Sequence, residues 1–215
     1  MKEKTYKVSE ITREKLINAA GELFSLQGTE NVGIRGITNL AGTKENAISY
    51  HFGGKEGLID AVWEKSLERF ERIDFFSYVN KNEKLLKTKD GQKRIITKII
   101  KDFYNIFYEN DLEAPWKNRF LLKGAFCENG LKHLKESLAN SWAFALLEVY
   151  KRVTKSKDDK KAQNWLICIG SPATLIAPNM DILDKGFLPK KVDKSAYKQL
   201  CKEVTKYALY SIGLI

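Results

Sequence analysis

Apolar residues recur at helical spacing along almost the whole chain, and no stretch alternates in the way that a β-strand would. A first helix is expected from Ser9 or Thr12, either of which can cap it, to Gly28, which can stop it. Its single apolar face consists of Leu16, Ala19, Ala20, Leu23 and Phe24. The pattern therefore predicts an amphipathic helix that packs one side against a core.

Two short helices and one long helix follow. The first short helix spans about residues 34–40 and is ended by Ala41-Gly42, and the second spans about 44–52 and is ended by Gly53-Gly54. The next apolar stripe keeps one face for four turns, from Ile59 to Ile73. Two short helices joined by a tight turn that contains glycine are typical of a helix-turn-helix unit.

The remaining sequence also predicts helices, which makes the expected fold class all-α. A proline suits the first turn of a helix, so Pro115 indicates a helix that begins at Trp116. Pro172 should kink or break the helix that contains it. The expected spans are 92–108, 116–125, 131–153, 158–176 and 195–212.

Composition agrees with a soluble globular protein and adds several exclusions. The chain has 215 residues, of which 43% are hydrophobic and 30% charged, enough to bury a core without disulfides or metals. Three cysteines lie far apart with no C-x-x-C spacing, so we expect buried thiols and no metal site. The longest nearly apolar run, residues 166–178, is shorter than the roughly 20 residues that cross a bilayer. With no apolar region for a signal peptide at the N-terminus, we expect a cytoplasmic protein without a membrane partner.

Signatures of an enzyme are missing. Neither His51 nor His133 is accompanied by a local nucleophile motif. The stretch Gly53-Gly54-Lys55-Glu56 is similar to the end of a phosphate loop, but Ser49 stands where that loop needs glycine and Glu56 where it needs Ser or Thr. We interpret it as a turn between helices, and we expect no catalytic residue and no cofactor.

The segment from Ile34 to Leu58 resembles the DNA-binding signature of the TetR family of bacterial transcriptional regulators. The matching positions are Ile37, Ala41-Gly42, Ile48, Tyr50-His51-Phe52, Lys55 and Leu58. The resemblance covers about residues 10–65. This chain departs from the family pattern at Thr38, Thr43, Lys44, Asn46 and Ser49, and Thr43 in place of an aliphatic residue can cap the recognition helix one residue early.

The distribution of charge does not mark the DNA-binding half. The net charge is +10, yet residues 1–72 hold 11 basic and 11 acidic residues, so residues 73–215 carry the whole excess. DNA binding must therefore depend on where individual charges point. The lysine-rich stretches 81–101, 151–161 and 185–206 are expected to be solvated helix surface and loops.

The first turns of a recognition helix present side chains to base edges in the major groove. Lys44 can pair with guanine or a phosphate, Asn46 with adenine, and the methyl group of Ala47 can contact thymine. Glu45 can accept from cytosine or can be a solvated acid that supports the helix N-terminus. Ser49 and Thr43 complete the candidates on this helix.

Residues that flank the groove are candidates for phosphate contacts. A phenol and an ammonium group donate well to phosphate oxygens, so Tyr50 and Lys55 are expected to act as clamps. His51 can be a phosphate donor or a half-buried packing residue. Arg35, on the preceding short helix, is the candidate for a groove or backbone contact from that helix.

The second half of the chain is rich in aromatic residues. For any one of them the ordinary interpretation is a core residue, while the resemblance implies that a subset lines a cavity for a small-molecule effector. The candidates for that cavity are Phe103, Tyr104, Phe107, Phe120, Phe126, Trp142 and Trp165.

The resemblance implies a helix-turn-helix DNA-binding domain over residues 1–57 and a ligand-binding and dimerisation domain over 58–215. It further implies a homodimer that binds double-stranded operator DNA, acts as a repressor and is released by the effector. Dimerisation would use the last two helices, with a seam of Leu166, Ile169, Ala173, Leu200, Val204 and Ala208. The alternative is a helical ligand-binding protein or enzyme that retains the N-terminal unit as a scaffold, which the zero net charge of residues 1–72 favours.

Overall fold

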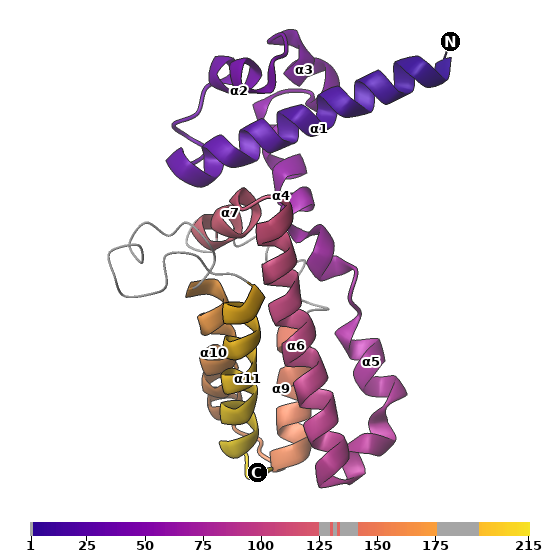
Figure 1. The fold of residues 1–215 in the computed structure, drawn as a ribbon, viewed down its shortest axis with the longest axis vertical. Helices are drawn as coiled ribbons and strands as arrows, with labels where there is room; N and C mark the ends of the chain where they lie inside the picture. The colour runs from indigo at the N-terminus through magenta and orange to yellow at the C-terminus, as the bar shows by residue number, and fades with distance from the viewer. Residues whose placement is uncertain (1, 125–129, 131–132, 134–141, 176–193) are drawn as a thin grey trace.

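A computed structural model of the chain describes residues 2–124, 130, 133, 142–175 and 194–215, and helices are its regular elements throughout these ranges. The expected all-α fold class is confirmed. The N-terminal helices form one end of the molecule and the C-terminal helices run away from it as a bundle (Figure 1). None of the helices in the described part combines the length and apolar composition needed to cross a membrane.

The N-terminal end consists of α1 (Lys2–Gln27), α2 (Ile34–Ala41), α3 (Asn46–Phe52) and α4 (Lys55–Glu71). Helix α1 begins earlier than the predicted Ser9 or Thr12, because the preceding lysines and glutamates are good helix formers and no breaker precedes Ser9. Gly42 ends α2 with a φ of 64°, and Gly53 ends α3 with a φ of 73°. Both glycines occupy the left-handed region, which other residues adopt at a cost.

The bundle contains α5 (Phe75–Lys81), the short 3₁₀ helix η1 (Glu83–Lys87), α6 (Lys89–Glu113), α7 (Trp116–Gly124), α9 (Trp142–Thr154), α10 (Asp159–Leu175) and α11 (Lys194–Tyr210). Asp74 caps α5 by accepting from the backbone N–H of Ser77, and Thr88 caps α6 in the same way with Gly91. Helix α9 is the described part of the helix predicted over 131–153.

Helix α10 continues through Pro172, where a kink or break was predicted. A proline inside a helix leaves the carbonyl four residues earlier without its N–H partner. That carbonyl belongs to Cys168, which is exposed, so water can replace the missing donor.

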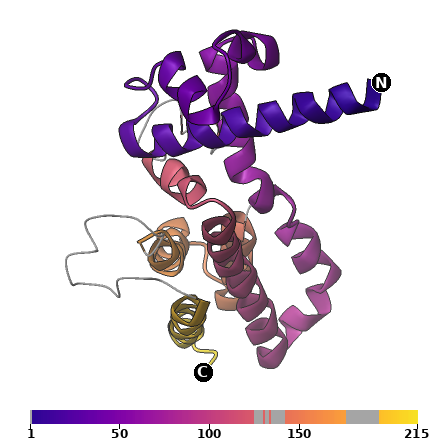
Figure 2. The same ribbon diagram turned by 45° about the horizontal axis from the view of Figure 1, so that its top comes forward.

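Two hydrophobic cores share α4. The N-terminal core holds the buried faces of α1 to α4 and the C-terminal core those of α5, α6, α9, α10 and α11, and Phe70 of α4 packs against both. In the turned view α1 crosses α4, which leads from one core into the other (Figure 2). The N-terminal core runs past residue 57 to Leu67 of α4 and also takes in Trp116, Phe120 and Leu121 of α7, while the division of the chain at residue 57 remains a prediction.

Helix α7 follows α6 in the chain, but its apolar residues pack against the N-terminal core. The Phe120 ring lies 4.7 Å from that of Trp63 and 6.4 Å from that of Phe24. The indole N–H of Trp116 donates to Asn18 of α1 at 3.3 Å. A Cβ atom at Gly21 would come within 2.4 Å of the Trp116 ring, so glycine is required for this close approach.

A charged cluster joins α4, α6 and α7. The guanidinium of Arg69 on α4 contacts the carboxylates of Glu109 at 2.8 Å and Glu113 at 2.7 Å on α6. The Glu113 carboxylate also contacts the Lys117 ammonium at 2.8 Å, and the Lys117 side chain is 1% exposed. Burial opposes ionisation of Glu113, but hydrogen bonds from Lys117 and Arg69 outweigh it and lower its pKa to about 2.

The predicted dimer seam was wrong for four of its six residues, while Leu166 and Leu200 are half-buried and stay a prediction. Ile169, Ala173, Val204 and Ala208 are buried inside the protomer, where α10 packs on α11 and both cover α6. The indole N–H of Trp165 donates to the Ala208 carbonyl at 3.3 Å and to Ser211 at 2.9 Å. Helical spacing identified an apolar face correctly, but that face serves the protomer's own core.

The outer sides of α10 and α11 expose other side chains. Ile167 is 61% exposed and Tyr207 48% exposed. Cys168 is exposed and Cys201 half-buried, so the expectation of buried thiols was wrong for Cys168, and Cys127 lies outside the described residues. Within the described ranges, His, Cys, Asp and Glu side chains do not gather into a potential metal site.

Candidate nucleic-acid interface

Helix α3 turns one side to the core and the other to solvent. Ile48 is fully buried, because it lies on the face that packs against α1 and α4. Asn46, Ser49 and Tyr50 are exposed on the opposite face, and Tyr50 is 79% exposed. Such a large exposed phenol gains nothing from the core, which makes this face a candidate surface for a partner.

The predicted cap of this helix was wrong. Helix α3 begins at Asn46, Glu45 stands at its N-cap without a side-chain hydrogen bond, and the Thr43 hydroxyl is buried without a partner. The backbone N–H of Thr43 instead donates to Thr38 at 2.9 Å and closes α2. Because Thr43 belongs to the end of α2, Lys44 lies in the turn and not in the first turn of α3.

Two predicted DNA contacts form an ion pair with each other. The Arg35 guanidinium on α2 lies 3.0 Å from the Glu45 carboxylate, and both side chains are exposed. Glu45 thus pairs across the turn, a role that neither sequence interpretation anticipated. An exposed pair of this kind contributes at most about 1 kcal/mol, so DNA can displace it at little cost.

The aromatic cluster and the two free cations frame the exposed face of α3. His51 is half-buried, with its ring 4.9 Å from that of Tyr50 in an edge arrangement. Ala47 is also half-buried. Lys44 is exposed in the turn and Lys55 begins α4, and neither takes part in a salt bridge among the described residues. The candidate interface therefore consists of α3 and its two ends, with the side chains of Lys44, Asn46, Ser49, Tyr50, His51 and Lys55.

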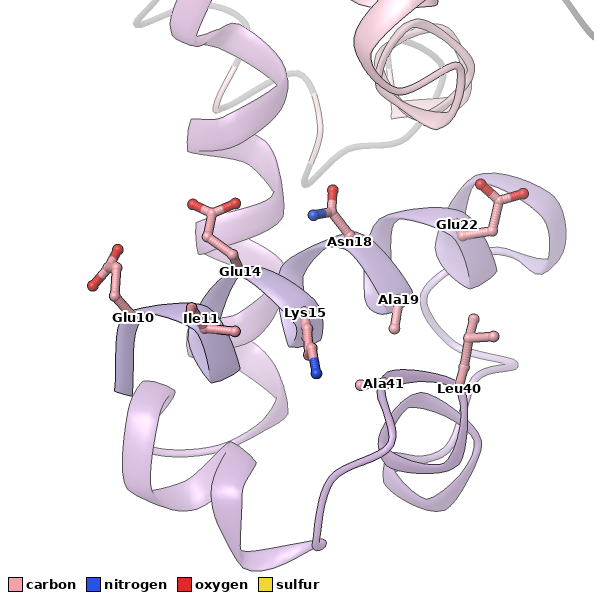
Figure 3. Close-up of a pocket in the computed structure, with 9 residues that line it drawn as sticks. All are labelled: Glu10, Ile11, Glu14, Lys15, Asn18, Ala19, Glu22, Leu40 and Ala41. Atoms are coloured by element: carbon pink, nitrogen blue, oxygen red, sulfur yellow. The ribbon is translucent and has the colours of Figure 1, made fainter. Parts of the chain in front are cut away.

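A second face of the N-terminal unit is unsuited to DNA. An open groove of about 620 Å³ lies between α1 and the end of α2, with Leu40 and Ala41 on one side (Figure 3). Glu10, Glu14 and Glu22 rise from α1 around it, and Lys15 is the basic residue among its described lining side chains. Lys65 pairs with Glu14 and Arg119 with Glu22, so these carboxylates already hold cations and the groove offers a phosphate few free donors.

The predicted ligand-binding aromatics are divided between the two cores. Phe103 stacks on Trp142 at 3.6 Å and meets Phe107 at 5.0 Å in the C-terminal core. Trp165 packs against Tyr150, and Phe120 lies in the N-terminal core. The Tyr104 hydroxyl donates to Ile169 at 2.8 Å, and burial raises its pKa. Phe126 lies outside the described residues, and the assignment of these rings to a ligand cavity remains a prediction.

One cavity was missed by the sequence interpretation. It has a volume of about 330 Å³ and lies between α6 and α11, and four of its lining residues are lysines from the stretches predicted to be plain surface. The recurrence of lysine at positions 194, 198 and 202 is a signal in the sequence, because residues four apart share one side of a helix.

Comparison with known proteins gives matches that centre on the N-terminal helices. The profile of "Bacterial regulatory proteins, tetR family" matches residues 16–62. The HTH-type transcriptional regulator AcrR of Shigella flexneri is 35% identical over 66 residues, which is 31% of either chain. The HTH-type transcriptional regulator SrpR of Pseudomonas putida is 37% identical over 62 residues, 29% of either chain. The matched segment thus spans about a third of the length of these relatives.

Similarity of fold extends over the rest of the chain. The crystal structure of HlyIIR, a hemolysin II transcriptional regulator, covers 92% of this chain and 98% of its own length with a TM-score of 0.58. The sequence identity is 18%, so the match concerns the fold alone. The chain therefore combines an N-terminal unit that has close sequence relatives with a C-terminal bundle that shares only the architecture.

Proposed function

The N-terminal unit of this chain belongs to the tetR family of bacterial regulatory proteins, and from this premise we propose that the protein is a transcriptional regulator that binds operator DNA. The exposed face of α3 carries the proposal. Asn46, Ser49 and Tyr50 are exposed, Lys44 precedes the helix and Lys55 follows it, and neither lysine takes part in a salt bridge among the described residues. Base-edge donors on a helix flanked by cations suit the major groove.

A homodimer is part of the proposal. Helix α3 has 7 residues and can read only a few base pairs, so useful affinity needs two half-sites about 34–36 Å apart. The exposed side of α10 and α11, with Ile167 and Tyr207, is our candidate for the dimer face. A two-fold symmetric dimer formed through this face would bind an operator whose two half-sites are related by the same symmetry, that is, a palindrome.

Repression relieved by a small molecule completes the proposal. Helix α4 begins beside α3 and continues to Phe70, whose ring lies 5.3 Å from that of Phe107 on α6. Arg69 joins the same two helices through Glu109 and Glu113. A ligand that shifts α6 would thus move α4 and change the spacing of the two α3 helices. The protein would leave the operator if the ligand binds more tightly to a dimer whose two α3 helices no longer match the spacing of the half-sites.

Asn46→Ala should change which operator sequences are preferred. If the amide pairs with adenine, its loss costs about 1–3 kcal/mol on the cognate site and less on sites with another base at that position. Binding to a panel of singly substituted operators measures this. The side chain is exposed, so the fold should be unaffected, and equal weakening on every operator would contradict base recognition by Asn46.

Lys55→Ala should weaken binding to all DNA sequences and lower the slope of log affinity against log salt by about one unit, because one phosphate contact is lost. Titrations at several salt concentrations give the slope. Lys15→Ala is the matched control, since Lys15 lies in the acidic groove of α1 and its loss should leave the slope unchanged. A loss confined to one base pair would assign Lys55 to base recognition.

An electrophoretic shift with the DNA that flanks the protein's own gene tests the proposed function as a whole. We expect a retarded complex that competitor DNA of unrelated sequence does not displace. Failure to bind this DNA at low salt, with the protein folded, would favour a helical ligand-binding protein or enzyme that retains the N-terminal unit as a scaffold.

A further inference from the structure

The cavity between α6 and α11 has the size and shape of a small-molecule site. Its volume of about 330 Å³ lies at the lower end of the range of ligand pockets, roughly 300–1,000 Å³. We call it the lysine groove and define it by its lining residues: Thr97, Lys101, Tyr104, Asn105, Tyr108, Lys194, Tyr197, Lys198, Cys201, Lys202 and Thr205. Phe103 and Trp142 are not among these lining residues, although the ring of Phe103 lies 5.7 Å from that of Tyr104.

The lysine groove is positively charged. Lys194, Lys198 and Lys202 line it from α11 and Lys101 from α6, and none of the described residues that line it is acidic. No salt bridge within the described ranges uses any of these four lysines. Ammonium groups around one cavity repel one another, and an anion placed among them relieves that repulsion.

The other polar groups of the groove offer less to a ligand. The Thr205 hydroxyl already donates to the Cys201 carbonyl at 2.7 Å, and the Tyr104 hydroxyl donates to Ile169. The lysine ammonium groups, with three N–H bonds each, are the cationic donors of the groove, beside the polar side chains of Thr97, Asn105 and Tyr108.

Aromatic rings supply an apolar wall. Tyr104 and Tyr197 are buried, and the rings of Tyr108 and Tyr197 lie 5.5 Å apart at an angle of 60°. The aliphatic stems of the lysines extend this wall towards the ammonium groups. An occupant therefore meets apolar surface at the base and cations at the rim.

We propose that the lysine groove binds a small amphipathic organic anion, with its carboxylate, sulfonate or phosphate among the four lysines and its aromatic or aliphatic body against the tyrosine rings. Binding would act on α6, whose Glu109 and Glu113 hold Arg69 of α4. The anion would thus serve as an effector, and this second step rests on the proposed function.

The test uses two fluorescent probes that share one ring system. 1-Anilinonaphthalene-8-sulfonate carries an anionic group, and N-phenyl-1-naphthylamine is the neutral compound without it. Titrated into the full chain, the sulfonate should bind at one site per chain and at least tenfold more tightly than the neutral probe. Equal affinity for the two probes would overturn the proposal, because the lysines would then contribute nothing.

Variants locate the site. Lys198→Gln combined with Lys202→Gln should weaken binding of the sulfonate about tenfold or more. Lys206→Gln, an exposed lysine of the same helix outside the groove, should leave the affinity within twofold. Asn105→Trp keeps every charge but fills the groove from an exposed position, and it should abolish binding. Unchanged affinity in Asn105→Trp would show that the probe binds elsewhere and would end the proposal.

A second measurement separates the site from its role. Saturating sulfonate should lower the affinity for the DNA that flanks the protein's gene, and this effect should disappear in Asn105→Trp. If the probe binds as expected but DNA affinity does not change, the site stands and the effector role fails. If the protein without probe does not bind that DNA, the proposed function fails, and the probe titrations still decide whether the groove is an anion site.

Discussion

Ala208→Asp should unfold the protomer, whereas Tyr207→Asp, one residue earlier on α11, should leave it folded and separate the proposed dimer. Ala208 of α11 is fully buried, and its backbone carbonyl accepts a hydrogen bond from the Trp165 indole of α10. An unpaired carboxylate at this position should cost at least about 3 kcal/mol. Tyr207 is 48% exposed on the outer side of the same helix. A carboxylate at position 207 is solvated in the monomer. In a symmetric dimer it would face the same carboxylate of the second protomer, and the two would repel each other.

Thermal melting and sedimentation measure the two effects separately. Tyr207→Asp should melt within a few degrees of the wild-type protein and sediment as a monomer at micromolar concentration. Lys161→Asp is a control for added negative charge, since Lys161 is exposed near the start of α10. A Tyr207→Asp protein that remains dimeric would remove this face from the interface, and a stable Ala208→Asp protein would contradict the packing of α10 on α11.

Glu113→Gln should lower the free energy of unfolding by about 3 kcal/mol, because it leaves the Lys117 ammonium buried without a carboxylate. Glu109→Gln is the matched control on the same helix. Glu109 is more exposed and pairs with Arg69 alone, so its loss should cost no more than about 1 kcal/mol. Denaturant titration of the two variants gives both numbers.

A second substitution tests the reason for the loss. Adding Lys117→Met to Glu113→Gln removes the stranded charge and should recover most of the stability, since an apolar residue of similar length can replace a buried charge. If Glu113→Gln and Glu109→Gln are equally stable, or the added Met recovers nothing, the buried ion pair does not stabilise the junction of α6 and α7.

The contribution of Glu113 should also depend on pH. Its pKa falls from an ordinary 4.5 to about 2 in the folded protein, so its stabilising effect is present above about pH 4.5 and is lost as the pH falls through about 2. The difference in melting temperature between the wild-type protein and Glu113→Gln should shrink across this range. A difference that stays constant to pH 2 would assign the effect to packing.

The all-α fold and the helix-turn-helix unit could be predicted because their signals are local. Gly42 and Gly53 stand where the backbone needs a left-handed residue, and the burial of Ile48 follows from helical spacing. Helix α5 was missed because it lacks such local signals. Helix α5 is as short as α3, with 7 residues, but no glycine stands at either of its ends to mark it, and an acidic cap such as Asp74 cannot be told from other acidic residues in a loop.

Long-range partners account for the errors at the sites. The buried faces of α10 and α11 were assigned to a second chain, because spacing reveals an apolar face and not what covers it. The pairing of Arg35 with Glu45 joins residues ten positions apart across a turn, and the lysine groove brings together residues about 100 positions apart. The lysines at 194, 198 and 202 show in the sequence as a repeat of four, but the sequence does not show that Lys101 of α6 faces them.

The packing of α7 on α1 has a consequence for hybrid regulators made by grafting the N-terminal helices onto another bundle. A junction at residue 57 would deprive Phe24 of Phe120 and would leave Gly21 facing a foreign side chain in place of Trp116. Helix α7 would have to be transplanted together with α1 to α4, although it lies more than 40 residues further along the chain. The unit that can be exchanged between regulators of this architecture is thus discontinuous in sequence.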